Sequence, residues 1–158
     1  MADFLPFYVV MVVGIPETIV VLLLGFQLFN DHISFKHAFI ASILASLNNY
    51  FIRYVGVAFG VHTLITISTI ILVCYLLTKK NVWKIASATM SGLVVMLAIQ
   101  VSEFLIIKVL AIETTISNQP WLNILIMLPE VIIMGIIFYV ARKRKFALFN
   151  SNAFEIKN

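Results

Sequence analysis

The chain has 158 residues, of which 62% are hydrophobic and 11% are charged. Soluble domains are about 45 to 50% apolar and about 25% charged, so this composition excludes an ordinary water-soluble domain. The formal net charge is +4, but the basic residues lie mainly between or after apolar blocks, which indicates membrane topology rather than binding of nucleic acid.

The apolar residues form blocks of roughly 20 residues, the length of an α-helix that crosses a bilayer. We do not expect the first block to be a cleavable signal peptide, because Asp3 lies where such a peptide is basic. We therefore expect an all-α, polytopic membrane helical bundle of about five transmembrane helices, with residues 1–149 as a single domain and residues 150–158 as a short polar tail. The expected spans are residues 5–29, 37–58, 61–78, 84–111 and 121–141.

The positions of the charged residues predict the orientation of the chain. Basic residues are enriched on the cytoplasmic side of membrane proteins. We therefore expect the N-terminus outside and the C-terminus in the cytoplasm, with the last basic cluster against anionic lipid headgroups. If the chain crosses five times, one side receives nine of the 11 lysine and arginine residues: Lys36, Lys79, Lys80, Lys84, Arg142, Lys143, Arg144, Lys145 and Lys157.

Polar and ionisable side chains inside the expected spans predict a functional site, because each costs at least a few kcal/mol on membrane insertion. They lie at the middle and outer levels of the five spans. One interpretation is that they form interhelical hydrogen bonds and one ion pair that hold the bundle together. The other is a polar cavity that opens to the outside and binds a ligand. The candidate ligand-binding residues are Glu17, Asn49, Arg53, His62, Gln100, Glu103 and Glu130.

The balance of charge among these candidates bears on the ligand. The three carboxylates of Glu17, Glu103 and Glu130 face a single arginine, Arg53. The surplus of acid favours a cationic ligand, a metal ion, a proton or a basic segment of a partner. Pro16 and Pro129 directly precede two of the glutamates; each removes a helix hydrogen bond, which is common at binding sites and moving joints but also ordinary in membrane helices.

Enzymatic chemistry is not expected. The sequence contains no HExxH, GxSxG or Walker motif. Cys74 is the single cysteine, and Asp31, His32 and His37 are better explained by a solvated loop than by a metal site. We expect no catalytic residues, no bound metal and no cofactor.

Several stretches resemble the membrane-embedded sensor region of Firmicute histidine kinases of the GHKL, accessory-gene-regulator type. They are Pro16-Glu17-Thr18, Gly25 to Phe29, Ser34-Phe35-Lys36, Tyr50 to Arg53, Phe59 to Leu64, and Glu103. The resemblance implies a receptor for an extracellular signal in a bacterial cytoplasmic membrane. Because no kinase domain follows the fifth span, we expect a free-standing sensor or accessory subunit.

The expected function is therefore a small signalling module that binds a ligand in an outward-facing polar cavity. Its expected partners are membrane lipid, a separate cytoplasmic kinase or another membrane subunit, and a second copy of the chain, but no nucleic acid. A substrate-binding membrane subunit of a small-molecule transporter and a structural or assembly subunit remain as alternatives.

Overall fold

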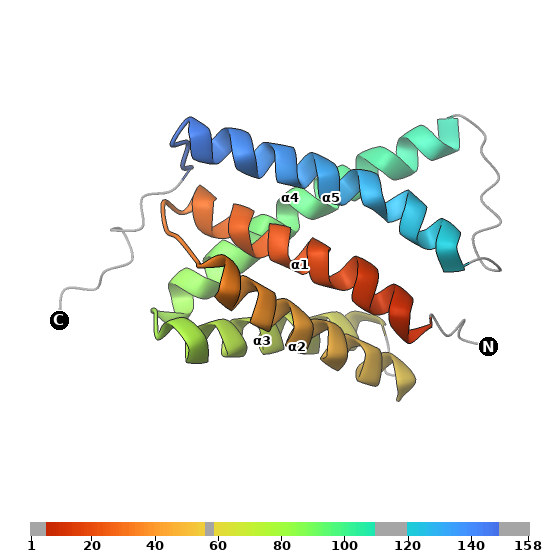
Figure 1. The fold of residues 1–158 in the computed structure, drawn as a ribbon, viewed down its shortest axis with the longest axis horizontal. Coiled ribbons are helices and arrows are strands. Elements are labelled where there is room, and N and C mark those ends of the chain that lie inside the picture. Colours follow the sequence, from red (N-terminus) through yellow and green to blue (C-terminus); the bar gives the residue numbers. More distant parts are fainter. Residues whose placement is uncertain (1–5, 56–58, 110–119, 149–158) are drawn as a thin grey trace.

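The helices of the protein agree with the expected all-α fold (Figure 1). The computed structural model describes residues 6–55, 59–109 and 120–148. Within them the chain forms α1 (Phe7–Leu28), α2 (Phe35–Tyr54), α3 (Phe59–Thr78), α4 (Val82–Val109) and α5 (Pro120–Lys143). Each helix lies within a few residues of one expected span, so the prediction of five long helices is confirmed. Whether residues 150–158 form a separate polar tail lies outside the described residues.

Among the described residues, three helical segments are long and apolar enough to cross a membrane: Phe7–Leu28, Gly60–Thr78 and Val82–Ile106. This is the make-up of a helical membrane protein. The number is smaller than the five expected crossings. Helix α2 is less apolar because it contains Lys36, His37, Asn48 and Asn49, and crossings by α2 and α5 stay predictions.

Helix α1 is the centre of the bundle. It packs against α2, α4 and α5, whereas α3 packs against α2 and α4. In Figure 1, α1 lies between α5 and α2, and α4 runs obliquely behind it. One buried cluster joins Leu22 and Phe26 of α1 to small residues of α2 and to Ile85 of α4. A second joins Leu24 of α1 to Met134 of α5.

Two glycines let the backbones of α1 and α4 come into direct contact. A Cβ atom added at Gly25 would lie 2.1 Å from the carbonyl oxygen of Ala88, and one added at Gly92 would lie 2.3 Å from that of Val21. Ala88 and Gly92 are one helical turn apart on α4, which is the spacing of small residues at packed membrane helices. The crossing of α1 and α4 therefore depends on the absence of side chains at both glycines.

The ends of α1 and α5 are capped in the same way and are tied together. Asn30 and Lys145 have φ angles of 51° just after the two helices, as in left-handed C-caps. Beyond α5, the backbone N–H of Leu148 donates to the carbonyl of Leu28 at 2.8 Å. We call this end of the bundle, where the α1–α2 loop, the α3–α4 loop and the residues after α5 meet, the basic end. It carries eight of the chain's basic residues: Lys36, Lys79, Lys80, Lys84 and Arg142 to Lys145.

Candidate functional site: a buried carboxylate between three helices

Glu130 is a buried acid in the middle of the bundle. It lies ten residues after the start of α5, or about 15 Å along the helix axis, and its side chain is 3% exposed. Its Oε2 accepts a hydrogen bond of 3.2 Å from Nε2 of Gln100 on α4. Its Oε1 is buried and accepts no hydrogen bond from the described residues. One carboxylate oxygen thus remains to interact with a further donor.

Two more carboxylates lie near Glu130. Glu17 on α1 and Glu103 on α4 are both close enough to repel its charge. Glu17 lies ten residues after the start of α1, as Glu130 does after the start of α5. Oε1 of Glu103 is likewise buried without a hydrogen bond to the described part of the chain. We call Glu17, Glu103 and Glu130 the carboxylate cluster.

Asn49 and His62, two of the other candidates, pair with each other between α2 and α3. Nε2 of His62 lies 2.8 Å from Oδ1 of Asn49, and His62 is 8% exposed. Beside them, Nδ2 of Asn48 donates to Oγ1 of Thr69 at 2.8 Å. Thr69 was not among the candidates. These contacts are of the interhelical kind that holds membrane helices together.

The seven candidates are thus placed in two groups rather than shown in one cavity. Glu17, Gln100, Glu103 and Glu130 gather between α1, α4 and α5, whereas Asn49 and His62 join α2 to α3. The seventh candidate, Arg53, belongs to α2 by its backbone, but its side chain lies outside the described residues. The expected cavity shared by all seven stays a prediction.

The carboxylate cluster does not have the geometry of a metal site. In the described ranges, no group of three or more His, Cys, Asp or Glu side chains is close enough to hold a metal ion. The carboxylates of Glu17 and Glu103 repel that of Glu130, but the three carboxylates are not close enough together to bind one metal ion. A cation that contacts all of them has to be larger than a bare metal ion.

Pro16 and Pro129 do not interrupt their helices. Helix α1 continues from Phe7 to Leu28 and α5 from Pro120 to Lys143, each with its proline inside. Each proline still lacks the N–H that would close a backbone hydrogen bond one turn earlier. Glu17 and Glu130 therefore each directly follow a residue that cannot make this backbone hydrogen bond.

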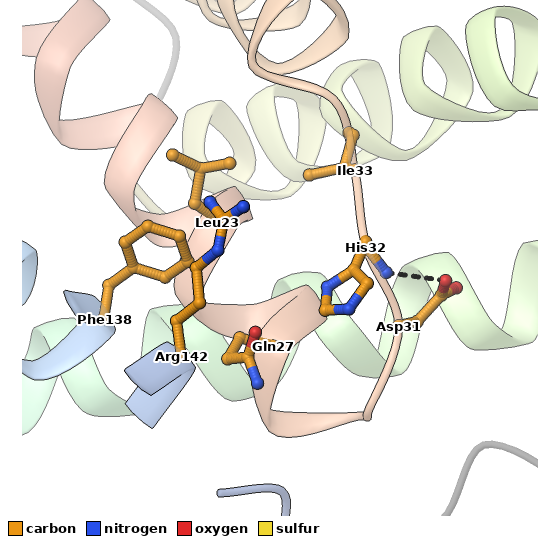
Figure 2. Close-up of a pocket in the computed structure, with 7 residues that line it drawn as sticks. All are labelled: Leu23, Gln27, Asp31, His32, Ile33, Phe138 and Arg142. Atoms are coloured by element: carbon orange, nitrogen blue, oxygen red, sulfur yellow. Dashed lines mark hydrogen bonds between the residues drawn. The ribbon is translucent and has the colours of Figure 1, made fainter. Parts of the chain in front are cut away.

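Gln27 is a buried polar residue that sequence reasoning did not select as a site residue. It is 4% exposed and lies in the last turn of α1. The signal for it in the sequence is an uncharged polar side chain at the end of an apolar span. A pocket of about 60 Å³ adjoins it at the basic end. Figure 2 shows the residues that line this pocket: Leu23, Gln27, Asp31, His32, Ile33, Phe138 and Arg142.

Comparisons with other proteins add no family to this description. No family model matches the chain, and neither a curated protein nor a solved structure matches it significantly. The resemblance to kinase sensor regions therefore stays a prediction. The feature that bears on function is the carboxylate cluster inside a helical membrane protein.

Proposed function

We propose that this protein is a small membrane sensor that binds an organic cation at the carboxylate cluster and relays its occupancy to a partner at the basic end. In this proposal all five helices cross a bacterial cytoplasmic membrane, the N-terminus is outside, and the basic end is cytoplasmic, in accord with the positive-inside rule. The observation that carries it is Glu130, a nearly inaccessible acid that has two acidic neighbours and one oxygen without a hydrogen-bond partner among the described residues.

A cation is favoured because buried like charges are costly. A carboxylate removed from water is stabilised only by a counter-charge, by hydrogen bonds or by protonation. Gln100 supplies one hydrogen bond to Glu130, and a cationic ligand supplies the rest. An alkylammonium or guanidinium group, free or on a basic peptide side chain, has several N–H donors and suits acids that do not converge on a metal ion.

The relay runs along α1 and α5. Both helices carry a proline followed by a glutamate in their middle, and both end at the basic end. There Leu148 donates to the carbonyl of Leu28, and Nε2 of Gln27 donates to the carbonyl of Phe146 at 3.3 Å. A ligand that draws Glu17 and Glu130 together changes the spacing of two helices whose ends are hydrogen-bonded. The partner that reads this change is a separate cytoplasmic protein such as a kinase, another membrane subunit or a second copy.

The test is a titration of the purified protein in lipid nanodiscs with methylammonium, guanidinium, lysine methyl ester, arginine methyl ester and potassium. We expect at least one organic cation to bind in calorimetry and to lose its binding in Glu130→Gln. The matched control is Asn48→Ala, which alters a polar contact between α2 and α3 and should leave binding unchanged. Equal binding by wild type and Glu130→Gln would overturn the proposal.

Flux separates a sensor from a transport subunit. The same cation, radiolabelled and added outside proteoliposomes, should bind without accumulating inside. Accumulation that is lost in Glu130→Gln would assign the carboxylate cluster to transport. That result would support the cation site and contradict the proposed sensor function.

A further inference from the structure

The pocket at the basic end is separate from the carboxylate cluster and contains both acceptors and donors of hydrogen bonds. Its volume of about 60 Å³ is several times the roughly 10 to 15 Å³ of cavity that one water molecule needs. The pocket therefore has room for a small terminal group such as an ammonium with its adjoining methylene. In Figure 2, Arg142 and Phe138 of α5 lie on one side of the pocket, Asp31 and His32 of the α1–α2 loop on the other, and Gln27 between them.

Gln27 supplies an unused acceptor. Its Nε2 donates to the carbonyl of Phe146 at 3.3 Å, which fixes the orientation of the amide. Its Oε1 is buried and has no hydrogen-bond partner among the described residues. A buried acceptor without a donor is costly, so this oxygen favours a ligand that carries an N–H group.

Asp31, on the opposite side of the pocket from Arg142, already forms an ion pair. Its Oδ1 accepts hydrogen bonds from Nζ of Lys80 and, at 2.7 Å, from the backbone N–H of His32. Lys80 also donates to the carbonyl of His32 at 2.7 Å. This ion pair ties the α1–α2 loop to the α3–α4 loop.

Arg142 supplies the opposite chemistry at the rim. Its guanidinium lies 6.0 Å from the ring centroid of Phe138, and in the described part of the chain the ion pair of Asp31 with Lys80 leaves Arg142 without a carboxylate partner. The planar, forked guanidinium matches two oxygens of a phosphate. The pocket thus offers a hydrogen-bond acceptor at Gln27 and a cationic donor at Arg142.

We propose that this pocket binds a phosphoethanolamine group, with the ammonium at Oε1 of Gln27 and the phosphate at Arg142. The pocket lies where α1 and α5 end, which is headgroup depth for helices that cross a bilayer. The group is therefore available from phosphatidylethanolamine, and a soluble phosphoethanolamine has the same chemistry. This inference does not depend on cation binding at the carboxylate cluster.

The ligands for the test differ in one feature each. The full-length protein, delipidated in detergent, is titrated with short-chain phosphatidylethanolamine, phosphatidylcholine and phosphatidylglycerol and with free phosphoethanolamine, and native mass spectrometry measures binding. We expect phosphatidylethanolamine to bind about tenfold more tightly than phosphatidylcholine, whose methylated ammonium has no N–H to donate. Equal affinity for these two lipids would overturn the proposal. Free phosphoethanolamine that binds as tightly as the lipid would support the pocket and make the soluble form its ligand.

Variants assign the binding to this pocket. Gln27→Leu removes the acceptor and should bring the affinity for phosphatidylethanolamine down to that for phosphatidylcholine, whereas Gln27→Glu keeps an acceptor and should retain the preference. Arg142→Gln should weaken both lipids about tenfold, and Arg144→Gln, an equally charged and exposed neighbour, should not. Because Arg142 is exposed, its variant should fold even if Gln27→Leu does not. Wild-type binding by Arg142→Gln would contradict the proposal.

Discussion

The side-chain amide of Gln100 donates a hydrogen bond of 3.2 Å to Glu130 and so joins α4 to α5 at the most buried acid of the described residues. The amide satisfies one oxygen of that carboxylate, while Glu17 and Glu103 repel its charge. The pair is therefore a partly compensated buried charge, an arrangement that lowers stability and favours binding of a counter-charge.

Removing the charge of Glu130 should stabilise the protein. Glu130→Gln keeps the shape of the side chain and relieves the repulsion, so we expect the free energy of unfolding to rise by about 1 to 3 kcal/mol in the absence of ligand. Gln100→Glu adds a fourth carboxylate at the same place and should lower it by a similar amount. Urea unfolding in mixed micelles, followed by circular dichroism, measures both; a less stable Glu130→Gln protein would show that the charge is already compensated.

A methyl group at Gly25 should disrupt the crossing of α1 and α4. Gly25→Ala places its Cβ against the carbonyl oxygen of Ala88, whereas nothing lies within 4 Å of a Cβ at Gly135. We expect Gly25→Ala to lower the free energy of unfolding by about 1 to 3 kcal/mol. Gly135→Ala should raise it by up to about 1 kcal/mol because alanine favours the helix. Equal effects of the two substitutions would contradict the close packing of these helices.

The contact between Asn49 and His62 should stabilise the α2–α3 hairpin without contributing to cation binding. In a double-mutant cycle with Asn49→Ala and His62→Ala, we expect a coupling energy of about 1 kcal/mol in unfolding. Calorimetric cation affinity should stay within experimental error for both variants. A loss of cation affinity in either variant would instead support the single cavity predicted from the sequence.

The proposed orientation is open to a labelling test. In a Cys74→Ala background, a cysteine at Lys36 should be protected from an impermeant maleimide added to intact cells and should react after lysis. A cysteine at Gly60, at the opposite end of the bundle and exposed, should react in intact cells. The reverse pattern would place the basic end outside.

Hydrophobic length predicted the helices well because, in lipid, the backbone of each span satisfies its own hydrogen bonds. Glu17 and Glu130 were also recognisable from the sequence, since an acid inside an apolar block is conspicuous. Which acids meet was not predictable, because it depends on the rotation of each helix. That rotation is set here by backbone contacts such as Gly25 against Ala88.

Gln27 was not predictable as a site residue for a different reason. It is uncharged and close to a helix end, where polar residues are usually solvated, and its burial arises from residues after α5 that fold back onto α1. Position along the spans alone groups Asn49 and His62 with the acids. Their mutual hydrogen bond depends on how α2 and α3 face each other, which periodicity alone does not determine.

The relay is tested most directly by a distance across the basic end. In the Cys74→Ala background, nitroxide labels at Lys36→Cys of α2 and Lys143→Cys of α5, both exposed positions, report their separation by pulsed electron resonance in nanodiscs. With the organic cation that binds best, we expect the distance distribution to shift, and to remain at its unliganded position in Glu130→Gln. A distribution that does not change when the wild-type site is saturated would contradict the account.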